Sequence, residues 1–99
     1  MIDLGRITGF EWDKANARKN EKHSVSMAEA EQVFFNSPLL LLEDIKHSIF
    51  ELRFHALGQT DNSRLLHITF TLRQSNEKIS VISARGMHRK ERAIYEKAT

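Results

Sequence analysis

Apolar and polar side chains alternate along two segments in the second half of the chain, residues 50–57 and 64–73. A period of two is typical of β-strands that bury one face. Turn-like residues at 58–63 and 75–78 connect these segments to a third one, 79–85. Short turns favour hairpins, so the three segments are predicted to form an antiparallel meander. The positions predicted to face the core are Phe50, Leu52, Phe54 and Ala56, followed by Leu66, Ile68, Phe70 and Leu72.

The first half of the chain carries helical signals instead. After a short predicted strand over residues 7–12, Asp13 stands where an N-cap would begin a polar helix that reaches about Lys22. Ser26 and Glu29 match a capping box, which predicts the start of a second helix. At helical spacing, the buried stripe of this second helix would consist of Met27, Ala30, Val33 and Phe34.

Two more segments complete the predicted fold. The apolar run at 39–43 is predicted to be a buried strand, and 88–98 a charged helix with Ala93, Ile94 and Tyr95 as its less polar positions. With a single proline and no flexible linker, residues 1–99 should form one α+β domain, in which helices cover one face of an antiparallel sheet. The open face is then expected to gather Glu51, Arg53, His55, His67 and Arg73.

Composition narrows the classes of function. The chain has 15 basic and 13 acidic residues, a formal charge of +2, and a concentration of Arg and Lys in its last third, which permits nucleic-acid binding without requiring it. It has no cysteine, so disulfides, thiolate metal sites and cysteine catalysis are excluded. The longest apolar run, 38–42, is too short to cross a bilayer, and the first residues do not resemble a secretory signal, so we expect a cytoplasmic protein without membrane contact.

The five histidines do not follow a metal-ligand spacing, and the chain contains no glycine-rich phosphate loop, nucleophile elbow or dinucleotide motif. We therefore expect no metal and no cofactor. The residue types expected on the open face suit RNA cleavage, in which the ribose 2′-hydroxyl attacks and the protein supplies a base, cations and an acid. The same residue types would also form an ordinary polar face or a binding face for a partner, so both alternatives stay open.

A set of short motifs runs through residues 10–97. Each one is weak alone, and they are Phe10-Glu11-Trp12-Asp13, Asn20, Lys22-His23-Ser24-Val25-Ser26, Glu29-Ala30, Val33-Phe34-Phe35, Asp44-Ile45-Lys46-His47-Ser48, Glu51-x-Arg53-Phe54-x-Ala56-Leu57-Gly58, Arg64-x-Leu66, Phe70-Thr71-x-Arg73, Val81-Ile82-Ser83-Ala84-Arg85, Arg89-Lys90-Glu91-Arg92 and Tyr95-Glu96. In this order and spacing, the set resembles the BrnT family of bacterial toxins.

The resemblance implies a compact α+β fold similar to RelE-type RNases and RNA cleavage that inhibits translation. It also implies neutralisation by a BrnA-like ribbon-helix-helix antitoxin, with operator DNA bound only through the complex. Position by position, it points to catalytic candidates at Lys22, His23, Glu51, Arg53, Arg85 and Tyr95. From their chemistry we assign phosphate binding to Arg53 and Arg85, the base to Glu51 or His23, and the proton donor or electrostatic support to Lys22 or Tyr95. The expected RNA-binding side chains are His55, Arg64, His67, Arg73 and Arg89.

Some positions depart from the family pattern. Ser24 stands where the family commonly has Gly, Ser80 where Arg is frequent, and the connection before the last helix carries Gly86 and His88. These departures keep two alternatives open beside the RNase: a catalytically inactive homologue that only binds the antitoxin, and a nucleic-acid-binding module without chemistry.

Overall fold

The computed structural model describes residues 2–99 and contains three α-helices and five strands. In chain order, the elements are a 3-10 turn at Leu4–Arg6, β1 (Gly9–Phe10), α1 (Lys14–Glu21), α2 (Met27–Val33), β2 (Leu40–Glu43), a second 3-10 turn at Ile45–His47, β3 (Phe54–Gln59), β4 (Leu65–Arg73), β5 (Lys78–Gly86) and α3 (Arg89–Ala98). The predicted α+β class is confirmed. Within residues 2–99, no helix has the length and apolar content needed to cross a membrane.

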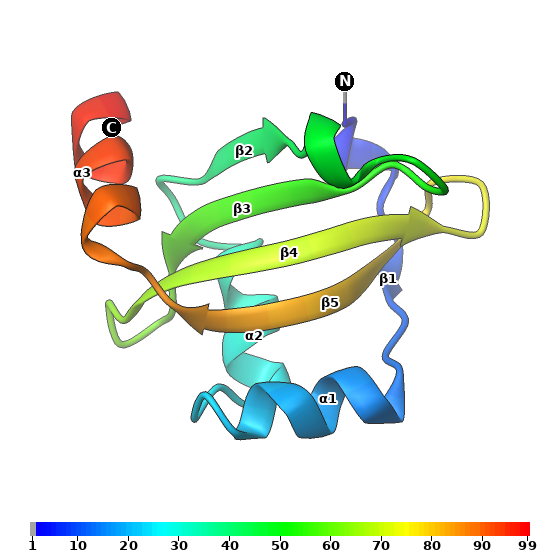
Figure 1. Ribbon diagram of the computed structural model, residues 1–99, viewed down its shortest axis with the longest axis horizontal. Helices are drawn as coiled ribbons and strands as arrows, with labels where there is room; N and C mark the ends of the chain where they lie inside the picture. Colours follow the sequence, from blue (N-terminus) through cyan, green and yellow to red (C-terminus); the bar gives the residue numbers. More distant parts are fainter. Residues whose placement is uncertain (1) are drawn as a thin grey trace.

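All five strands belong to one sheet, in the order β1-β5-β4-β3-β2 (Figure 1). Strands β2 to β5 are antiparallel neighbours, so the predicted meander of three strands forms the centre of the sheet. At one edge, however, β1 pairs with β5 in parallel, through Gly9 with Lys78 and Phe10 with Ile79. The sheet is therefore mixed: the predicted antiparallel meander holds, and β1, whose pairing the sequence did not predict, adds a parallel edge.

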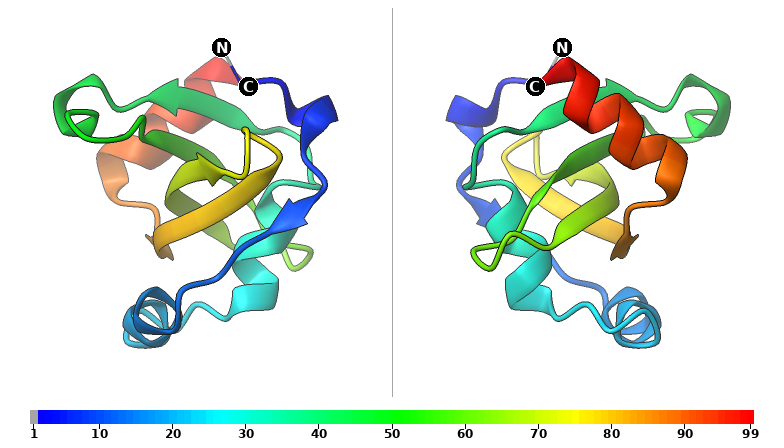
Figure 2. Two further views of the ribbon diagram at one scale, coloured as in Figure 1. Left: turned by 90° about the vertical axis from the view of Figure 1, so that its right-hand side faces the viewer. Right: turned by 90° about the vertical axis from the view of Figure 1, so that its left-hand side faces the viewer.

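Helix α2 packs on one face of the sheet, over β3 and β4, and the core lies between α2 and the sheet. Helix α1 lies along the edge of the sheet at β5 (Figures 1 and 2). Ala30 and Val33 of α2 are fully buried against Ile68 and Phe70 of β4, and the ring of Phe34 meets Phe70 edge-on at 5.0 Å. Burying each large apolar side chain contributes about 1.5–3 kcal/mol. The opposite face carries the polar positions of β3 and β4 and is left open by these helices. It holds α3 and the turn at Ile45–His47 at its margins (Figure 2).

Three expectations about burial were wrong. Met27 is 45% exposed, so the buried stripe of α2 begins at Ala30. The segment at 39–43 is an edge strand rather than a buried one, because β2 has a neighbour on one side only. Phe50 and Leu52 lie outside any strand and are 99% and 67% exposed.

Hydrogen bonds in the loop between β2 and β3 explain why β3 begins only at Phe54. The Asp44 amide donates to the Arg53 carbonyl (2.8 Å), the Arg53 amide donates to Ser48 Oγ (3.0 Å), and Ser48 Oγ donates to the Asp44 carbonyl. The backbone of Arg53 is thus satisfied within the loop. The alternating pattern continues N-terminal to Phe54, but residues 50–53 pair with no strand, although β4 extends to Arg73.

A register shift in the β4/β5 pair decides which face β5 presents. Thr69 pairs with Ser83 and Phe70 with Val81, so Ile82 has no partner opposite it. Such a bulge reverses the alternation of the strand beyond it. Val81 and Ala84 both reach the core as a result, while Ser80 and Arg85 both lie on the open face. The bulge also accounts for the two adjacent apolar residues Val81 and Ile82, which a regular alternating strand would not contain.

Asn20 closes the edge of β5 beyond its pairing with β1. This residue of α1 is buried, and its Oδ1 accepts a hydrogen bond of 2.8 Å from the Ala84 amide. The bond gives an outward-facing strand amide an acceptor and fixes α1 against the sheet.

We expect Asn20→Ala to lower the free energy of unfolding by about 1–3 kcal/mol, because the Ala84 amide would stay buried without an acceptor. Urea denaturation measures the change. Asn62→Ala, in an exposed loop, is the matched control and should stay within about 0.5 kcal/mol of the parent. Equal stability of the two variants would show that the Asn20 bond does not hold α1 in place.

Candidate functional site on the open sheet face

Two histidines from neighbouring strands stack on the open face. His55 of β3 and His67 of β4 have ring centroids 4.7 Å apart, with an angle of 38° between the planes. His55 also contacts Thr69 of β4, with Nδ1 and Oγ1 at 3.1 Å. The alternating pattern of the two strands placed both imidazoles on one face, and the register of β3 with β4 brings them into contact.

A carboxylate flanks the His55 side of the stack. Asp44, buried at the end of β2, lies 3.0 Å from His55 Nε2 and 3.0 Å from His47 Nδ1. Burial by itself would raise the pKa of Asp44, but hydrogen bonds from the His47 ring and amide outweigh it and hold the pKa below its ordinary value. Asp44 therefore stays ionised and orients both rings.

A second carboxylate flanks the His67 side. Glu91, in the first turn of α3, forms a two-point ion pair with Arg85 of β5 at 2.8 Å for each contact, and its Oε2 lies 3.7 Å from His67 Nε2. It also accepts a hydrogen bond of 2.8 Å from the His88 amide and so helps to cap the start of α3. Burial alone would raise the pKa of Glu91, but the bonds from Arg85 and His88 lower it to about 2.

His67 is the more buried of the two stacked rings. Burial, opposed by Glu91 and reinforced by Arg85, lowers the pKa of His67 to about 4. The ring is therefore neutral at pH 7. Its Nδ1 is buried and has no hydrogen-bond partner among the described residues.

A polar pocket of about 340 Å³ lies farther along the same face. Glu51, Arg53 and Arg73 line it together with Ser80 of β5. Arg73 forms an ion pair with Glu51, and this hydrogen bond raises the pKa of Arg73. Within residues 2–99, the side chain of Arg53 has no ion-pair partner, and its buried Nε has no hydrogen-bond acceptor.

Arg53 connects the pocket to the histidine stack. Phe54 is buried toward the helices, so Arg53 and His55 on either side of it project onto the open face. The five residues expected on this face thus form two adjacent groups: the stack with Asp44, Glu91 and Arg85, and the pocket with Glu51, Arg53 and Arg73.

The remaining candidates lie elsewhere. Lys22 and His23 are exposed in the connection between α1 and α2, where Arg64 holds the backbone through the carbonyls of His23 and Ser24. Arg64 also pairs with Glu29 of the capping box, at 3.1 Å. None of these side chains lines the polar pocket.

The last two candidates belong to α3. Tyr95 is buried, its hydroxyl donates to the Pro38 carbonyl at 2.6 Å, and burial raises its pKa. Arg89 is exposed at the first position of the helix.

The family of this chain follows from a match to a sequence profile. The sequence profile of the family described as "Ribonuclease toxin, BrnT, of type II toxin-antitoxin system" matches residues 12–91. This chain belongs to that family. Among solved structures, the chain is similar to the Brucella abortus ribonuclease toxin BrnT, with a TM-score of 0.61 and 21% identity over 82% of this chain and 97% of the other. Among proteins with curated annotation, none matches significantly.

The departures from the family pattern have visible consequences. Ser24 adopts φ 58°, a left-handed conformation that glycine adopts without strain, so the serine costs about 1 kcal/mol. His88 occupies the N-cap of α3, and its amide donates a hydrogen bond to Glu91. Gly86 has open space around the position of a Cβ, so nothing there requires a glycine.

Asp44 and Glu91 organise the site but were not among the predicted site residues. Each accepts a hydrogen bond from the amide of a histidine three residues away: Asp44 lies before His47, and Glu91 lies after His88. That spacing is typical of capping and is the signal that could have drawn attention to them. Their contacts to His55 and His67 depend on tertiary structure and leave no mark on the local sequence.

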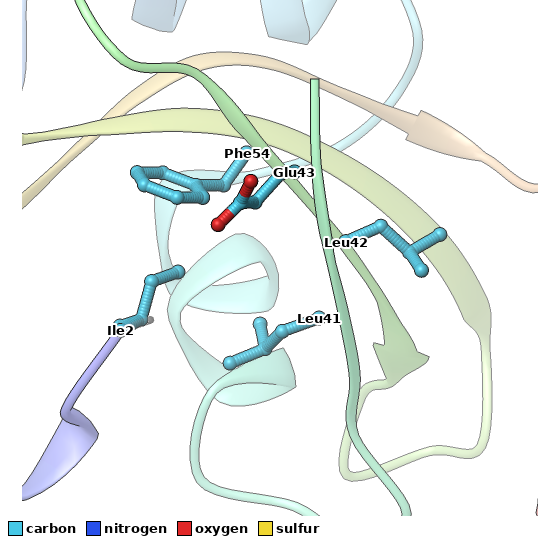
Figure 3. Close-up of a pocket in the computed structure, with 5 residues that line it drawn as sticks. All are labelled: Ile2, Leu41, Leu42, Glu43 and Phe54. Atoms are coloured by element: carbon cyan, nitrogen blue, oxygen red, sulfur yellow. The ribbon is translucent and has the colours of Figure 1, made fainter. Parts of the chain in front are cut away.

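Another pocket of the molecule is apolar. Ile2, Leu41, Leu42 and Phe54 line it, and Glu43 is its one charged residue (Figure 3). A single carboxylate offers no acid–base pair, so we do not place chemistry there. Residues 2–99 contain no group of three or more His, Asp or Glu side chains arranged to hold a metal ion.

The lowered pKa of His67 makes stability depend on pH. The unfolded chain takes up a proton near pH 6.5, whereas the folded protein does so only near pH 4. Between these values the unfolded state binds more protons, so we expect the free energy of unfolding to fall as the pH is lowered, by up to about 3 kcal/mol from this residue.

Urea denaturation of the parent and of His67→Gln between pH 8 and 4.5 measures this effect. At pH 8 the two differ only through packing and hydrogen bonding. As the pH falls, the parent should lose more stability than the variant, and parallel curves would contradict the assignment to His67.

Proposed function

We propose that this chain is an endoribonuclease toxin that cleaves RNA on the open sheet face, in the polar pocket. The observation that supports this most is the state of Arg53, whose guanidinium has no partner although it lies beside an oriented carboxylate. Arg53 is partly buried, and its buried Nε–H without an acceptor is costly; a phosphate supplies the missing charge and acceptors. RNA brings that phosphate together with its own nucleophile.

Glu51 is the proposed base. Arg73 holds its carboxylate in the pocket, where it takes the proton of the ribose 2′-hydroxyl. The 2′-oxygen forms a bond to phosphorus, and Arg53 and Arg73 stabilise the added negative charge. The bond to the 5′-oxygen then breaks, leaving a 2′,3′-cyclic phosphate and a 5′-hydroxyl end.

His55 is the proposed donor of the proton that the leaving oxygen needs. It lies two residues after Arg53, and Asp44 and Thr69 fix its orientation. His67 is neutral at pH 7 and supports His55 by stacking, while Arg85, held by Glu91, extends the basic surface. Asp44 and Glu91 act as positioning residues.

Cleavage of cellular RNA would inhibit translation in the cytoplasm. The family description names a type II toxin–antitoxin system, which supports a protein antitoxin as the partner. We propose a BrnA-like ribbon-helix-helix protein in this role, with operator DNA bound only through the complex. Expression of the chain alone should then arrest growth.

Glu51→Gln is expected to lower the cleavage rate about 10²- to 10⁴-fold, because the amide cannot take up the proton. Gln keeps the shape and a hydrogen bond to Arg73, so folding should be retained. The rate is measured on single-stranded RNA with purified protein in EDTA, with product ends identified as cyclic phosphates. Unchanged cleavage would remove Glu51 from the mechanism.

Arg53→Ala is expected to lower the rate about 10²- to 10³-fold, with Arg53→Lys in between, since Lys keeps the charge but not the two-point geometry. Arg6→Ala, at an exposed arginine that does not line the pocket, is the control. Growth of cells that express each variant gives a second measurement. Tolerated expression of a folded parent chain that cleaves no RNA would favour the inactive homologue.

A further inference from the structure

The polar pocket has a second wall that the proposed chemistry does not use. Trp12 and Asp13 line it from the connection between β1 and α1, with Glu11 beside them, and Asn16 lines it from the first turn of α1. Trp12 is half-buried, and its indole Nε1 donates a hydrogen bond of 2.7 Å to Glu31 of α2. Because the N–H is bonded to Glu31, the orientation of the ring is restrained, and Trp12 contributes aromatic surface to the pocket rather than a free donor.

The charges in the pocket leave one group unmatched. Glu51 is paired with Arg73, Glu11 accepts from Gln74 at 3.0 Å, and Asp13 accepts from the amides of Ala15 and Asn16. The carboxylates thus have partners, while Arg53 has none among the described residues. The pocket combines an aromatic surface with a free cation and an amide side chain, Asn16.

We infer that this pocket binds one nucleotide of single-stranded RNA, with its base against the ring of Trp12 and its phosphate on Arg53. The volume of about 340 Å³ lies in the range of small-ligand sites. Stacking on an aromatic ring is the common way to hold an unpaired base, and Asn16 can donate to and accept from the base edge. The inference rests on the proposed RNase function and adds a specificity-determining subsite to it.

Trp12 is the one tryptophan of the chain, so intrinsic fluorescence reports directly on this wall. The probe is a mixed-sequence 2′-O-methyl RNA hexamer, which lacks the nucleophile and is not cleaved. We expect saturable quenching of the Trp12 emission by the hexamer, and little quenching by inorganic phosphate at the same concentration. Quenching by phosphate equal to that by the hexamer would overturn the base subsite.

Affinity is measured in parallel by anisotropy of a labelled hexamer. Trp12→Leu should weaken binding about ten- to hundredfold, and Trp12→Phe, which keeps an aromatic ring and the fold, should lie between it and the parent. Phe35→Leu, at an aromatic residue that is 78% exposed and outside the pocket, is the matched control and should bind like the parent. Asn16→Ala should change which bases flank the cleavage sites.

The outcomes separate this inference from the proposed function. If RNA is cleaved and the hexamer binds, but both Trp12 variants bind like the parent, the subsite is wrong and the RNase proposal stands. If the folded parent neither binds the hexamer nor cleaves RNA, the RNase proposal fails and the subsite fails with it.

Discussion

The register shift between β4 and β5 is the constraint on which the open face depends. A sheet covered by helices on one side must keep apolar residues on that side along its whole length, and β5 does so only because Ile82 is left without a partner. Beyond the shift, Val81 fills the core. Ser80 and Arg85 share the open face although they are five positions apart, a separation that would place them on opposite faces of a regular strand. The pocket around Arg53 and the ion pair of Arg85 with Glu91 therefore belong to one surface.

Pairing divides the charged groups of that surface into two kinds. Asp44 and Glu91 are bound by several donors each, so their role is to hold His55, His67 and Arg85 in place. Arg53 lies in the same surface without a counter-charge among the described residues. An unmatched cation beside paired carboxylates marks a point where an external anion lowers the free energy. The proposed function and the nucleotide subsite both begin from this asymmetry.

Family membership and site chemistry rest on different evidence. The profile match over residues 12–91 places the chain among BrnT ribonuclease toxins, and the similarity to the Brucella abortus structure, at 21% identity, concerns the fold. The roles given to Glu51, Arg53 and His55 come from the contacts of this chain. They differ from the expectations drawn from resemblance at Lys22, His23 and Tyr95, which lie outside the pocket, with the Tyr95 hydroxyl engaged by Pro38.

The sequence by itself determined the elements whose signals are local. The Asp13 and Ser26 caps begin α1 and α2, and the alternation in β4 assigns Ile68 and His67 to opposite faces, because capping and side-chain direction depend on neighbours along the chain. Only the tertiary structure decided the parallel pairing of β1, the exposed loop at Phe50 and the contact of Asp44 with His55. The β1 pairing and the Asp44 contact join segments that are distant in sequence, and at Phe50 the chain lies outside the sheet although the alternating pattern continues. The local spacing of residues signals none of these.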